Sequence, residues 1–547
     1  MIRPRYLAGF TGHRDLDATH AVRQALAAEL AKLKALIHER GGLLEFYASA
    51  AYGSDTMACE EAGKLGIPVH LVLPKPVVLV AKSDEVDRRE GFAADFWKDE
   101  VFLQDEWDRA YRLIQAAGRG DQGGTLRLTP GTQVQPECYY DAGLLMLEAV
   151  DVLVAVWDGA PARGIGGTEH LIRLAEKRGM ARIVIPASGG EAKSEGLQKL
   201  ADADEASRLI FMELEEFSHD CAADAEADAA AETAEQFFDR LERCSDKHSK
   251  DFRLSLVRMI LWHGTATLVA AIAAVLPQTP LPWKIVLAAL AALELTLVVK
   301  AYRRGRRLHH DNTHERWMQS RFAAELMRAM KHSAGLLDPL HPLVARHQPQ
   351  WRRFAITAGL MIRRENALLR WPEARETYLR ERLRHPDPTI GQIAYFTSKQ
   401  AAAEPLFKRT NWWGAKLGGA AIFFVVGALL FKLYVISAKL AHAPYPGPVG
   451  DNPLSTTSWL AAFCFSLLPI ALPLAAGIFI SLRTALDCGR RTYRYRELSE
   501  RLTAAAGLIE TLQTEAAIRR NVAVVEEVLL DELVEWHLAE QQNGAHG

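Results

Sequence analysis

Four apolar segments constrain this chain more than any other feature. They come in two close pairs, 259–276 with 283–299 and 417–436 with 459–482. An α-helix rises about 1.5 Å per residue, so about 20 residues cross the hydrocarbon core of a bilayer. The first pair is short for that distance and is expected to tilt little or to thin the bilayer locally. We therefore predict an all-α region with four transmembrane helices. The alternative is four buried core helices of a large soluble protein.

The basic residues that flank these segments predict an orientation. They gather after the second segment, before the third and after the fourth: Lys300, Arg303, Arg304, Arg306, Arg307, Lys408, Arg409, Lys416, Arg483, Arg490, Arg491, Arg494 and Arg496. The connections inside each pair carry little charge. The positive-inside rule then places both termini and residues 301–410 in the cytosol. The opening stretch "MIRPRYLAGFTGHR" lacks an apolar h-region, so no cleavable signal is expected.

Length and composition set broader limits. A chain of 547 residues is expected to form about three or four domains. Its six cysteines are scattered, with no C-x-x-C pair and no His/Cys cluster, so neither a metal site nor a disulfide framework is predicted. The net charge of −2 gives no reason to expect a nucleic-acid partner.

Residues 5–186 alternate short apolar runs with helical stretches, which is typical of a parallel α/β sheet. The predicted strands lie in "RYLAGFTG", "LLEFYASA", "PVHLVLP", "DVLVAVWDG" and "ARIVIP". Loops rich in Gly, Ser, Thr and Asp follow three of them, at 9–14, 50–55 and 157–169. Ligands of such sheets bind beyond the carboxyl ends of the strands. The three loops therefore predict a binding site for a nucleotide-like ligand.

The stretch "ARGIGGTEHLI", residues 162–172, is the most specific of these signals. A glycine-rich turn that opens a helix directs backbone N–H groups at an anion. We expect any side chain at Gly166 or Gly167 to block that approach. Nearby, His13, Arg14 and Arg163 are suited to contact a phosphate. The alternative is an ordinary strand-to-helix turn capped by Thr168.

An acidic, alanine-rich seam follows at 202–235. Within it, "EASRLIFMELEEF" is expected to add a last strand at 209–212. The next stretch, "DCAADAEADAAAETAEQ", fits either a solvated linker or a charged helix that runs toward the first apolar segment.

The helices that follow each apolar pair share a pattern. Arg316, Arg321 and Glu325 have the same R-x4-R-x3-E spacing as Arg491, Arg496 and Glu500. We interpret this as two copies of one unit, each with an entry helix, a hairpin of two spans and a long exit helix. Chance agreement between Arg/Glu-rich helices is the alternative.

Three features resemble the SLATT family. They are "GQIAYFTSKQAAAEPLFKRTNWW" before the third span, the Arg/Glu-rich helix after the fourth, and the tail "EEVLLDELVEWH" with its spaced Glu526, Glu532 and Trp536. The resemblance covers about 389–540, with a looser echo at 236–375. It implies two-span membrane modules that are linked to nucleotide-sensing domains in bacterial conflict systems.

The N-terminal motifs "GFTGHR", "ASAAYGSDTMACEEAGKLGIPVHLVLP" and "DVLVAVWDGAPARGIGGTEHLI" resemble the SLOG superfamily over about 5–210. This implies a Rossmann-like domain related to the Lonely Guy phosphoribohydrolases and to DNA-processing protein A. Together with the phosphate-gripping residues, the resemblance places the ligand site at Gly9, Thr11, Gly12, His13, Arg14, Gly53, Ser54, Asp55, Asp158, Arg163, Gly166, Gly167, Thr168 and Glu169.

One departure from that family bears on catalysis. Its hydrolytic members carry P-G-G-x-G-T-x-x-E, with the acid three residues after the threonine. That position is Leu171 here, and the acid, Glu169, directly follows Thr168. At a helix start the two positions point about 200° apart, since each residue turns about 100°. We therefore predict no catalytic residue, although His13 as a general base is an alternative for which the sequence shows no oriented partner.

Together these signals predict four parts: a SLOG-like domain at 1–210, an acidic linker at 211–238, and SLATT-like units at 239–388 and 389–547. The function implied is that of a membrane effector in the inner membrane of bacteria. It would sense a nucleotide second messenger, cyclic ADP-ribose-like or a cyclic oligonucleotide, and permeabilise the membrane in antiphage defence. The expected partners are that ligand, the lipid bilayer and further copies of the chain; no cofactor is expected. The alternative is a membrane-tethered NAD or nucleotide hydrolase.

Overall fold

The computed structural model describes residues 2–80, 85–129, 137–162, 164–198, 200, 205–219, 233–276, 281–337, 340–365, 371–440, 460 and 462–545. The chain forms two compact units, and both are discontinuous in sequence. The α/β unit consists of Met1–Cys244, Met318–Leu379 and Gly507–Gly547. The hairpin unit consists of Ser245–Trp317 and Arg380–Ala506. The domains predicted from the sequence are consecutive stretches of the chain, whereas each compact unit combines segments that are far apart in the chain.

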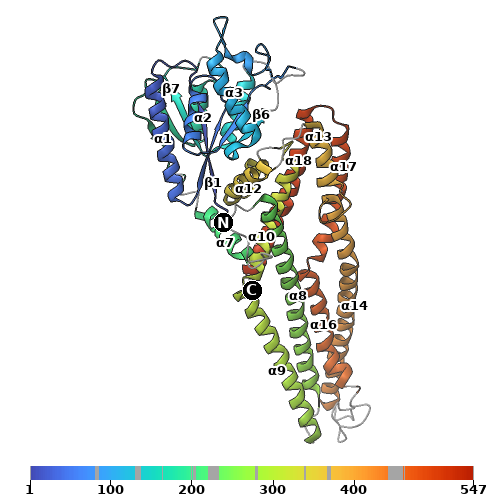
Figure 1. Cartoon of the computed structure of the whole chain (residues 1–547). Coiled ribbons are helices and arrows are strands. Elements are labelled where there is room, and N and C mark those ends of the chain that lie inside the picture. Colours follow the sequence, from blue (N-terminus) through green and yellow to red (C-terminus); the bar gives the residue numbers. More distant parts are fainter. Residues whose placement is uncertain are drawn as a thin grey trace. The chain divides into compact units, whose positions relative to one another are not determined.

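A seven-stranded sheet forms the centre of the α/β unit (Figure 1). Its strands are β1 (Arg5–Thr11), β2 (Leu43–Ala48), β3 (Val69–Leu73), β6 (Thr125–Leu128), β7 (Val152–Trp157), β8 (Ala181–Pro186) and β9 (Lys193–Glu195). Their order is β6-β3-β2-β1-β7-β8-β9, with only β9 antiparallel to its neighbour. The chain first builds outward from β1 through β2 and β3 to β6. It then returns to add β7 and β8 on the other side of β1.

Helices cover both faces of this sheet, which is why the central strands are apolar on both sides. The helices of the domain are α1 (Thr19–Glu39), α2 (Ser54–Lys64), α3 (Gln104–Arg119), α4 (Glu137–Ala149) and α5 (Thr168–Lys177). Successive side chains of β1 alternate between two cores. Tyr6 and Phe10 pack with residues of α1, α2 and α3, whereas Leu7 packs with residues of α4 and α5. A two-stranded hairpin, β4 (Trp97–Lys98) with β5 (Val101–Phe102), precedes α3.

The structure confirms an N-terminal domain with a parallel α/β sheet and corrects one predicted strand. Residues 209–212 lie inside the helix α7 (Glu205–His219). The apolar side chains of Ile210, Phe211, Leu214 and Phe217 are buried. Their spacing of one, three and three residues follows the 3.6-residue helical period rather than the two-residue period of a strand. Residues 220–232, on which the linker interpretation falls, lie outside the described residues.

Further helices complete the α/β unit. They are α10 (Thr313–Ser333), of which the part from Met318 onward belongs here, α11 (His341–His347), α12 (Arg352–Glu365), α13 (Trp371–Thr377) and α18 (Glu515–Ala545). Ile356 and Leu360 of α12 join the same core as Leu7 and as the buried residues of α4 and α5. Helix α12 thus packs directly against the α/β domain.

Two buried carboxylates fix α12 to the sheet. Asp151, just before β7, accepts from the backbone N–H of Leu7 at 2.9 Å and pairs with both Arg353, at 2.6 Å, and Arg352. Glu45 in β2 accepts from Arg364 at 2.8 Å and contacts His70 Nε2 at 2.6 Å. Burial alone would raise the pKa of Glu45, but the hydrogen bond with His70 and the nearby arginine charges lower it to about 2.

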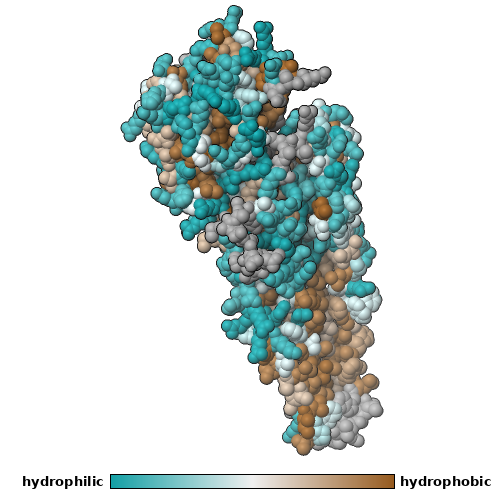
Figure 2. Space-filling model, viewed as in Figure 1, coloured by the Kyte–Doolittle hydropathy of each residue, from teal (hydrophilic) through white to brown (hydrophobic). Residues whose placement is uncertain are grey.

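Among the described residues, four helices are long and apolar enough to cross a membrane, and their apolar parts belong to the hairpin unit. They lie in α8 (Ala234–Val275), α9 (Leu281–His310), α14 (Gln392–Leu440) and the helix that runs from the π-helical Phe463–Leu467 through α16 (Leu468–Ala485). Of the most apolar window of each, only 6–17% is buried. Figure 2 shows these apolar side chains exposed along the helices. Such exposure does not fit buried core helices of a soluble protein, so these features indicate a membrane protein.

The hairpins contact one another closely. A Cβ at Gly264 in α8 would lie 2.4 Å from the side chain of Ile478 in α16, so the small residue lets the two helices approach closely. Within the second hairpin, Phe431 of α14 stacks on Phe465 with ring centres 4.5 Å apart. The third and fourth apolar segments, which form the second pair in the sequence, pack together as α14 and α16.

The two copies of the proposed repeat are both helical but have different surroundings. The guanidinium of Arg321 in α10 lies 4.2 Å from the ring centre of Trp536 in the α/β unit. Its counterpart Arg496 in α17 (Cys488–Thr511) lies 3.7 Å from Glu404 in the hairpin unit. The tail residue Glu526 is buried and accepts from the hydroxyl of Tyr378 at 2.8 Å. The repeat itself stays a prediction.

Candidate functional site

A cavity of about 930 Å³ opens at the carboxyl ends of β1, β2 and β7. The chain changes its direction of growth across the sheet between β1 and β7, and ligands of open parallel sheets bind at such a point. The predicted ligand residues that line this cavity are Thr11, Gly12, His13, Arg14, Asp55, Asp158, Gly166, Gly167, Thr168 and Glu169. The three loops singled out from the sequence therefore meet in one place.

Three predicted ligand residues instead support the walls. A Cβ at Gly9 would lie 3.0 Å from Val150 and 3.1 Å from Met146, so this glycine lets α4 approach β1. Gly53 has φ of +88° and a Cβ there would lie 2.0 Å from the carbonyl oxygen of Arg14. The hydroxyl of Ser54 donates to the carbonyl oxygen of His13 at 2.8 Å. Arg163 lies outside the described residues.

The glycine-rich loop forms a tight turn before α5, in which the N–H of Gly167 donates to the carbonyl oxygen of Gly164 at 3.2 Å, and its two glycines differ. Gly166 has φ of +82°, and a Cβ there would lie 2.8 Å from the backbone nitrogen of Tyr140. Gly167 has φ of −67° and ψ of 166°, which any residue adopts, so the expected strain of a side chain applies to Gly166 and not to Gly167. Helix α5 then begins at Thr168, where the first N–H groups have no partner within the helix.

The acids of the cavity wall are paired with bases. His13 Nε2 lies 3.1 Å from Asp158 Oδ1, which gives His13 an oriented partner that the sequence did not reveal. Glu169 pairs with Arg173 one turn further along α5. Both Glu169 and Leu171 line the cavity, although the helical period separates their directions. Leu171, at the position of the family's acid, is buried.

Asp55 differs, because its carboxyl group is buried against the cavity and forms no salt bridge with any cation among the described residues. Its Oδ1 accepts from the hydroxyl of Ser49 at 2.9 Å. Burial raises the pKa of Asp55 to about 7, although the Ser49 hydrogen bond and the charge of Arg14 oppose the shift. Asp55 therefore changes charge near neutral pH.

Sequence reasoning missed the aromatic and ionic groups on one side of the cavity. Tyr139 of α4 lines it and donates its hydroxyl hydrogen bond to Asp95, which pairs with Lys75 at 2.7 Å. Tyr52 lines the cavity from the loop after β2. Tyr52 lay inside a motif quoted for the site, so an aromatic residue next to Gly53 was a usable signal. Tyr139 comes from a helix that no sequence motif connected to the loops.

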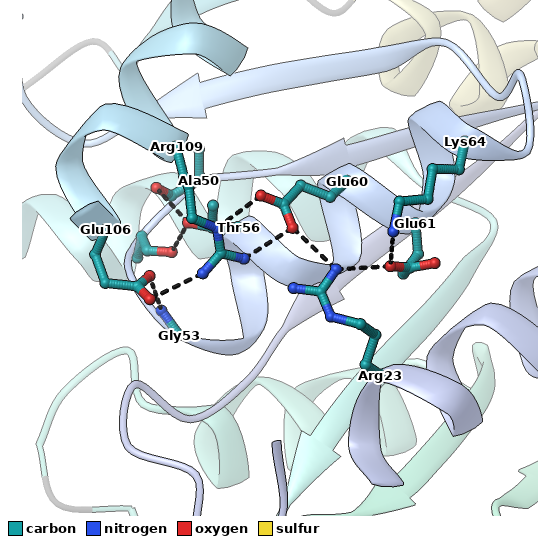
Figure 3. A network of polar contacts seen from close by, with 10 residues as sticks. Arg23, Ala50, Gly53, Thr56, Glu60, Glu61, Lys64, Glu106 and Arg109 are labelled. Atoms are coloured by element: carbon teal, nitrogen blue, oxygen red, sulfur yellow. Dashed lines mark hydrogen bonds and ion pairs between the residues drawn. The ribbon is translucent and has the colours of Figure 1, made fainter. Parts of the chain in front are cut away.

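A polar network outside the cavity holds the loop after β2 in place (Figure 3). Arg109 of α3 binds Glu60 of α2 through two hydrogen bonds of 2.7 and 2.8 Å, and Arg23 of α1 lies 3.0 Å from the same carboxylate. Glu106 accepts from the backbone N–H of Gly53 at 3.4 Å. Charges on α1 and α3 thus converge on α2, which carries Asp55, and on the preceding loop, which carries Tyr52.

Asp55→Asn is expected to remove a pH dependence of ligand binding. Above pH 7 the ionised Asp55 repels an anionic ligand, so wild-type affinity should fall about fivefold or more between pH 6 and 8, the effect of roughly 1 kcal/mol of repulsion. The folded state also holds a proton that an unfolded aspartate releases near pH 3.8, so stability should fall as the pH rises through 7. Calorimetric titration with a nucleotide at both pH values measures the first effect.

Asp17 provides the matched control, because it lies on the exposed rim of the same cavity. Asp17→Asn should leave the pH dependence in place. Equal affinities of the wild-type protein at pH 6 and pH 8 would contradict the assignment to Asp55.

Comparisons with protein-family models, with curated proteins and with solved structures found no match to this chain. Among the described residues, no group of three or more His, Cys, Asp or Glu side chains is placed to hold a metal ion. The site is therefore interpreted from its own geometry.

Proposed function

We propose that this chain is a membrane effector of bacterial antiphage defence. Its Rossmann-like, SLOG-type α/β unit binds a nucleotide second messenger, and its SLATT-type hairpins respond by opening or disrupting the inner membrane, which arrests growth of the infected cell. The N- and C-termini face the cytosol in this proposal. The candidate ligands are cyclic ADP-ribose-like molecules and cyclic oligonucleotides.

One observation carries the proposal: a single chain joins a cavity suited to phosphate with four apolar helices. The cavity has a glycine turn with φ of +82° at Gly166, the N-terminus of α5 and the side chains of His13 and Arg14. Such a turn and helix end bind anions through backbone N–H groups. The exposed apolar helices of the hairpin unit give the same chain a means of acting on a bilayer.

The effector needs several copies of the chain if it conducts. Four helices enclose little space, so we propose that a pore forms between the hairpin units of a homo-oligomer. A ligand shifts such an assembly only as far as its affinity differs between the closed and open states. Crosslinking in membranes that yields only monomer, with and without ligand, would argue against a pore.

A liposome assay tests the proposal directly. The full-length protein is reconstituted into liposomes that contain a fluorescent dye, and a panel of cyclic ADP-ribose, ADP-ribose, cyclic dinucleotides and cyclic trinucleotides is added. We expect at least one of them to bind by calorimetry and to release the dye. A panel in which no nucleotide gives heat or a thermal shift rejects nucleotide sensing.

A membrane-tethered NAD or nucleotide hydrolase is the second candidate. Two observations favour it: His13 is oriented by Asp158 at 3.1 Å, and Asp55 in the same cavity has a pKa of about 7, suited to proton transfer near neutral pH. Incubation with NAD and nucleoside monophosphates, followed by detection of the released base, separates the candidates. Turnover that Glu169→Gln or Asp55→Asn lowers at least about 100-fold would favour the hydrolase.

A further inference from the structure

Arg14 places a cationic side chain in the cavity, separate from the backbone of the glycine-rich loop. Its guanidinium carbon lies 5.3 Å from the ring centre of Tyr52 and 5.4 Å from that of Tyr139. The two rings come from different elements, the loop after β2 and helix α4. A planar guanidinium held against aromatic faces keeps donors in its plane for a phosphate. Arg14 is exposed, so a ligand in the cavity can reach it.

The backbone around Arg14 is held firmly. Two hydrogen bonds from Ser54, through its N–H at 3.1 Å and its hydroxyl at 2.8 Å, reach the carbonyl oxygen of His13. The missing side chain of Gly53 lets α2 approach the carbonyl oxygen of Arg14. Tyr52 in turn packs on Phe96 with ring centres 5.9 Å apart. The guanidinium is thus positioned before a ligand arrives, which lowers the entropic cost of binding.

The charges on this side of the cavity leave a net attraction for an anion. Lys75 pairs with Asp95 at 2.7 Å and neutralises it, so the charge of Arg14 is not cancelled by that carboxylate. Asp55 is only partly ionised at neutral pH, because its pKa is about 7. Of the other acids of the wall, Asp15 and Glu169 pair with Lys98 and Arg173, Asp17 lies on the exposed rim, and the charge of Asp158 is offset by His13 only when that imidazole is protonated.

Tyr139 sets the separation between this feature and the glycine-rich loop. A Cβ at Gly166 would lie 3.1 Å from the carbonyl carbon of Tyr139, whereas the ring of the same tyrosine lies beside Arg14. Tyr139 thus lies between the glycine-rich loop and Arg14, so a ligand in the cavity can contact both. The cavity, at about 930 Å³, is near the upper end of the roughly 300–1,000 Å³ range of small-molecule sites.

We propose that Arg14, held between Tyr52 and Tyr139, is a second anion subsite, and that the ligand is a nucleotide with two phosphate groups. A cyclic dinucleotide has this chemistry. The inference rests on the proposed binding of a nucleotide and adds a second contact for its ligand. One phosphate lies at the N-terminus of α5, the other at Arg14, and the apolar floor that includes Val72 and Met146 accepts a base.

The test uses the full-length protein in lipid nanodiscs and calorimetric titration with four probes. Cyclic di-AMP and cyclic di-GMP carry separated phosphates, ADP-ribose carries adjacent ones and AMP carries one. We expect a cyclic dinucleotide to bind at least 10-fold more tightly than AMP, which can occupy only one of the two anion subsites. Arg14→Gln should weaken it about 10- to 100-fold, the loss typical of a hydrogen bond to a charged group, and should leave AMP within about twofold.

Control variants make the result specific. Arg119→Gln removes an exposed arginine of α3 that pairs with Asp121 outside the cavity, and it should leave all affinities unchanged. Tyr52→Leu keeps the charge of Arg14 but removes one supporting ring, so it should weaken only the cyclic dinucleotide. Unfolding temperatures of the unliganded variants show that each is folded.

The outcomes separate this inference from the proposed function. If AMP binds as tightly as the cyclic dinucleotides and Arg14→Gln changes neither, the second subsite is rejected while nucleotide binding stands. If no nucleotide binds the wild-type protein, both the inference and the proposed function are rejected.

Discussion

Gly166→Val is expected to abolish the nucleotide response of the full-length protein. Gly166 has φ of +82°, and a Cβ there would lie 2.8 Å from Tyr140 N and 2.9 Å from Tyr140 Cα. These are backbone atoms of α4, so the loop must move as a whole. Strain of this kind costs about 1–3 kcal/mol. Displacing several N–H donors, each worth about 1.5–3 kcal/mol toward a charged group, should lower affinity at least about 100-fold.

Gly159→Val is the matched control for this variant. Gly159 also has a positive φ, +83°, but a Cβ there meets no atom within 4 Å, and the residue does not line the cavity. Both variants pay the same kind of backbone strain, and only Gly166→Val displaces the loop. Calorimetry and dye release from liposomes measure the difference. A folded Gly166→Val protein with wild-type affinity would mean that the stretch is only a strand-to-helix turn.

The same loop illustrates what could be predicted from the sequence. Its glycines predicted an anion site, which stays a prediction although the loop lines the cavity, and two adjacent glycines are equivalent in a sequence. Backbone torsions depend on what packs against the loop. Tyr140 of α4 contacts the position of the missing Cβ of Gly166, whereas Gly167 has ordinary extended angles. Only the tertiary structure distinguishes the two.

The strands show a similar division. Strands β1, β2, β3 and β7 are largely apolar and buried on both faces, whereas β8 is buried at every second residue; the sequence predicted each of the five. Strand β6, "TLRL", was missed because it is short and alternates apolar with polar residues, including Arg127. Residues 209–212 resembled a strand because four residues are too few to distinguish the two periodicities. The continuing pattern at Leu214 and Phe217 decides for a helix.

The composition of the two compact units could not be predicted from local patterns. Helix α12 lies some 150 residues beyond the sheet in sequence yet joins its core through Ile356 and Leu360. The buried partners Asp151 and Arg353 each look like an ordinary charged residue in the chain. Their pairing depends on tertiary contacts between distant segments, which a single sequence does not display.

Asp151→Ala is expected to destabilise the α/β unit strongly. The carboxylate is buried and pairs with two arginines of α12, one of which, Arg353, is itself buried. Removing one partner of a buried ion pair costs about 3–5 kcal/mol, because the remaining charge stays without compensation. For a unit of this size that loss corresponds to a fall of roughly 10 °C in the temperature of its unfolding transition. Differential scanning fluorimetry in nanodiscs measures it.

An exposed pair of the same kind serves as the control. Asp121 pairs with Arg119 at 3.1 Å, and both side chains are exposed, so Asp121→Ala should change stability by no more than about 0.5 kcal/mol. An Asp151→Ala protein that unfolds at the wild-type temperature would show that these ion pairs add no net stability.

The titration of Asp151 gives the same prediction a second, independent readout. Burial by itself would raise the pKa of this carboxyl group, but Arg353 and Arg352 hold it well below its usual range. The folded state therefore stays ionised at a pH where an unfolded aspartate takes up a proton. The stability that Asp151 contributes is complete above pH 3.8 and is lost as the pH falls further. Asp151→Ala should consequently unfold at a temperature that depends less on pH between 5 and 3 than that of the wild-type protein. The variant should keep the acid sensitivity that comes from Glu45. The pKa of Glu45 stays at about 2, because its partners on β3 and α12 are unchanged.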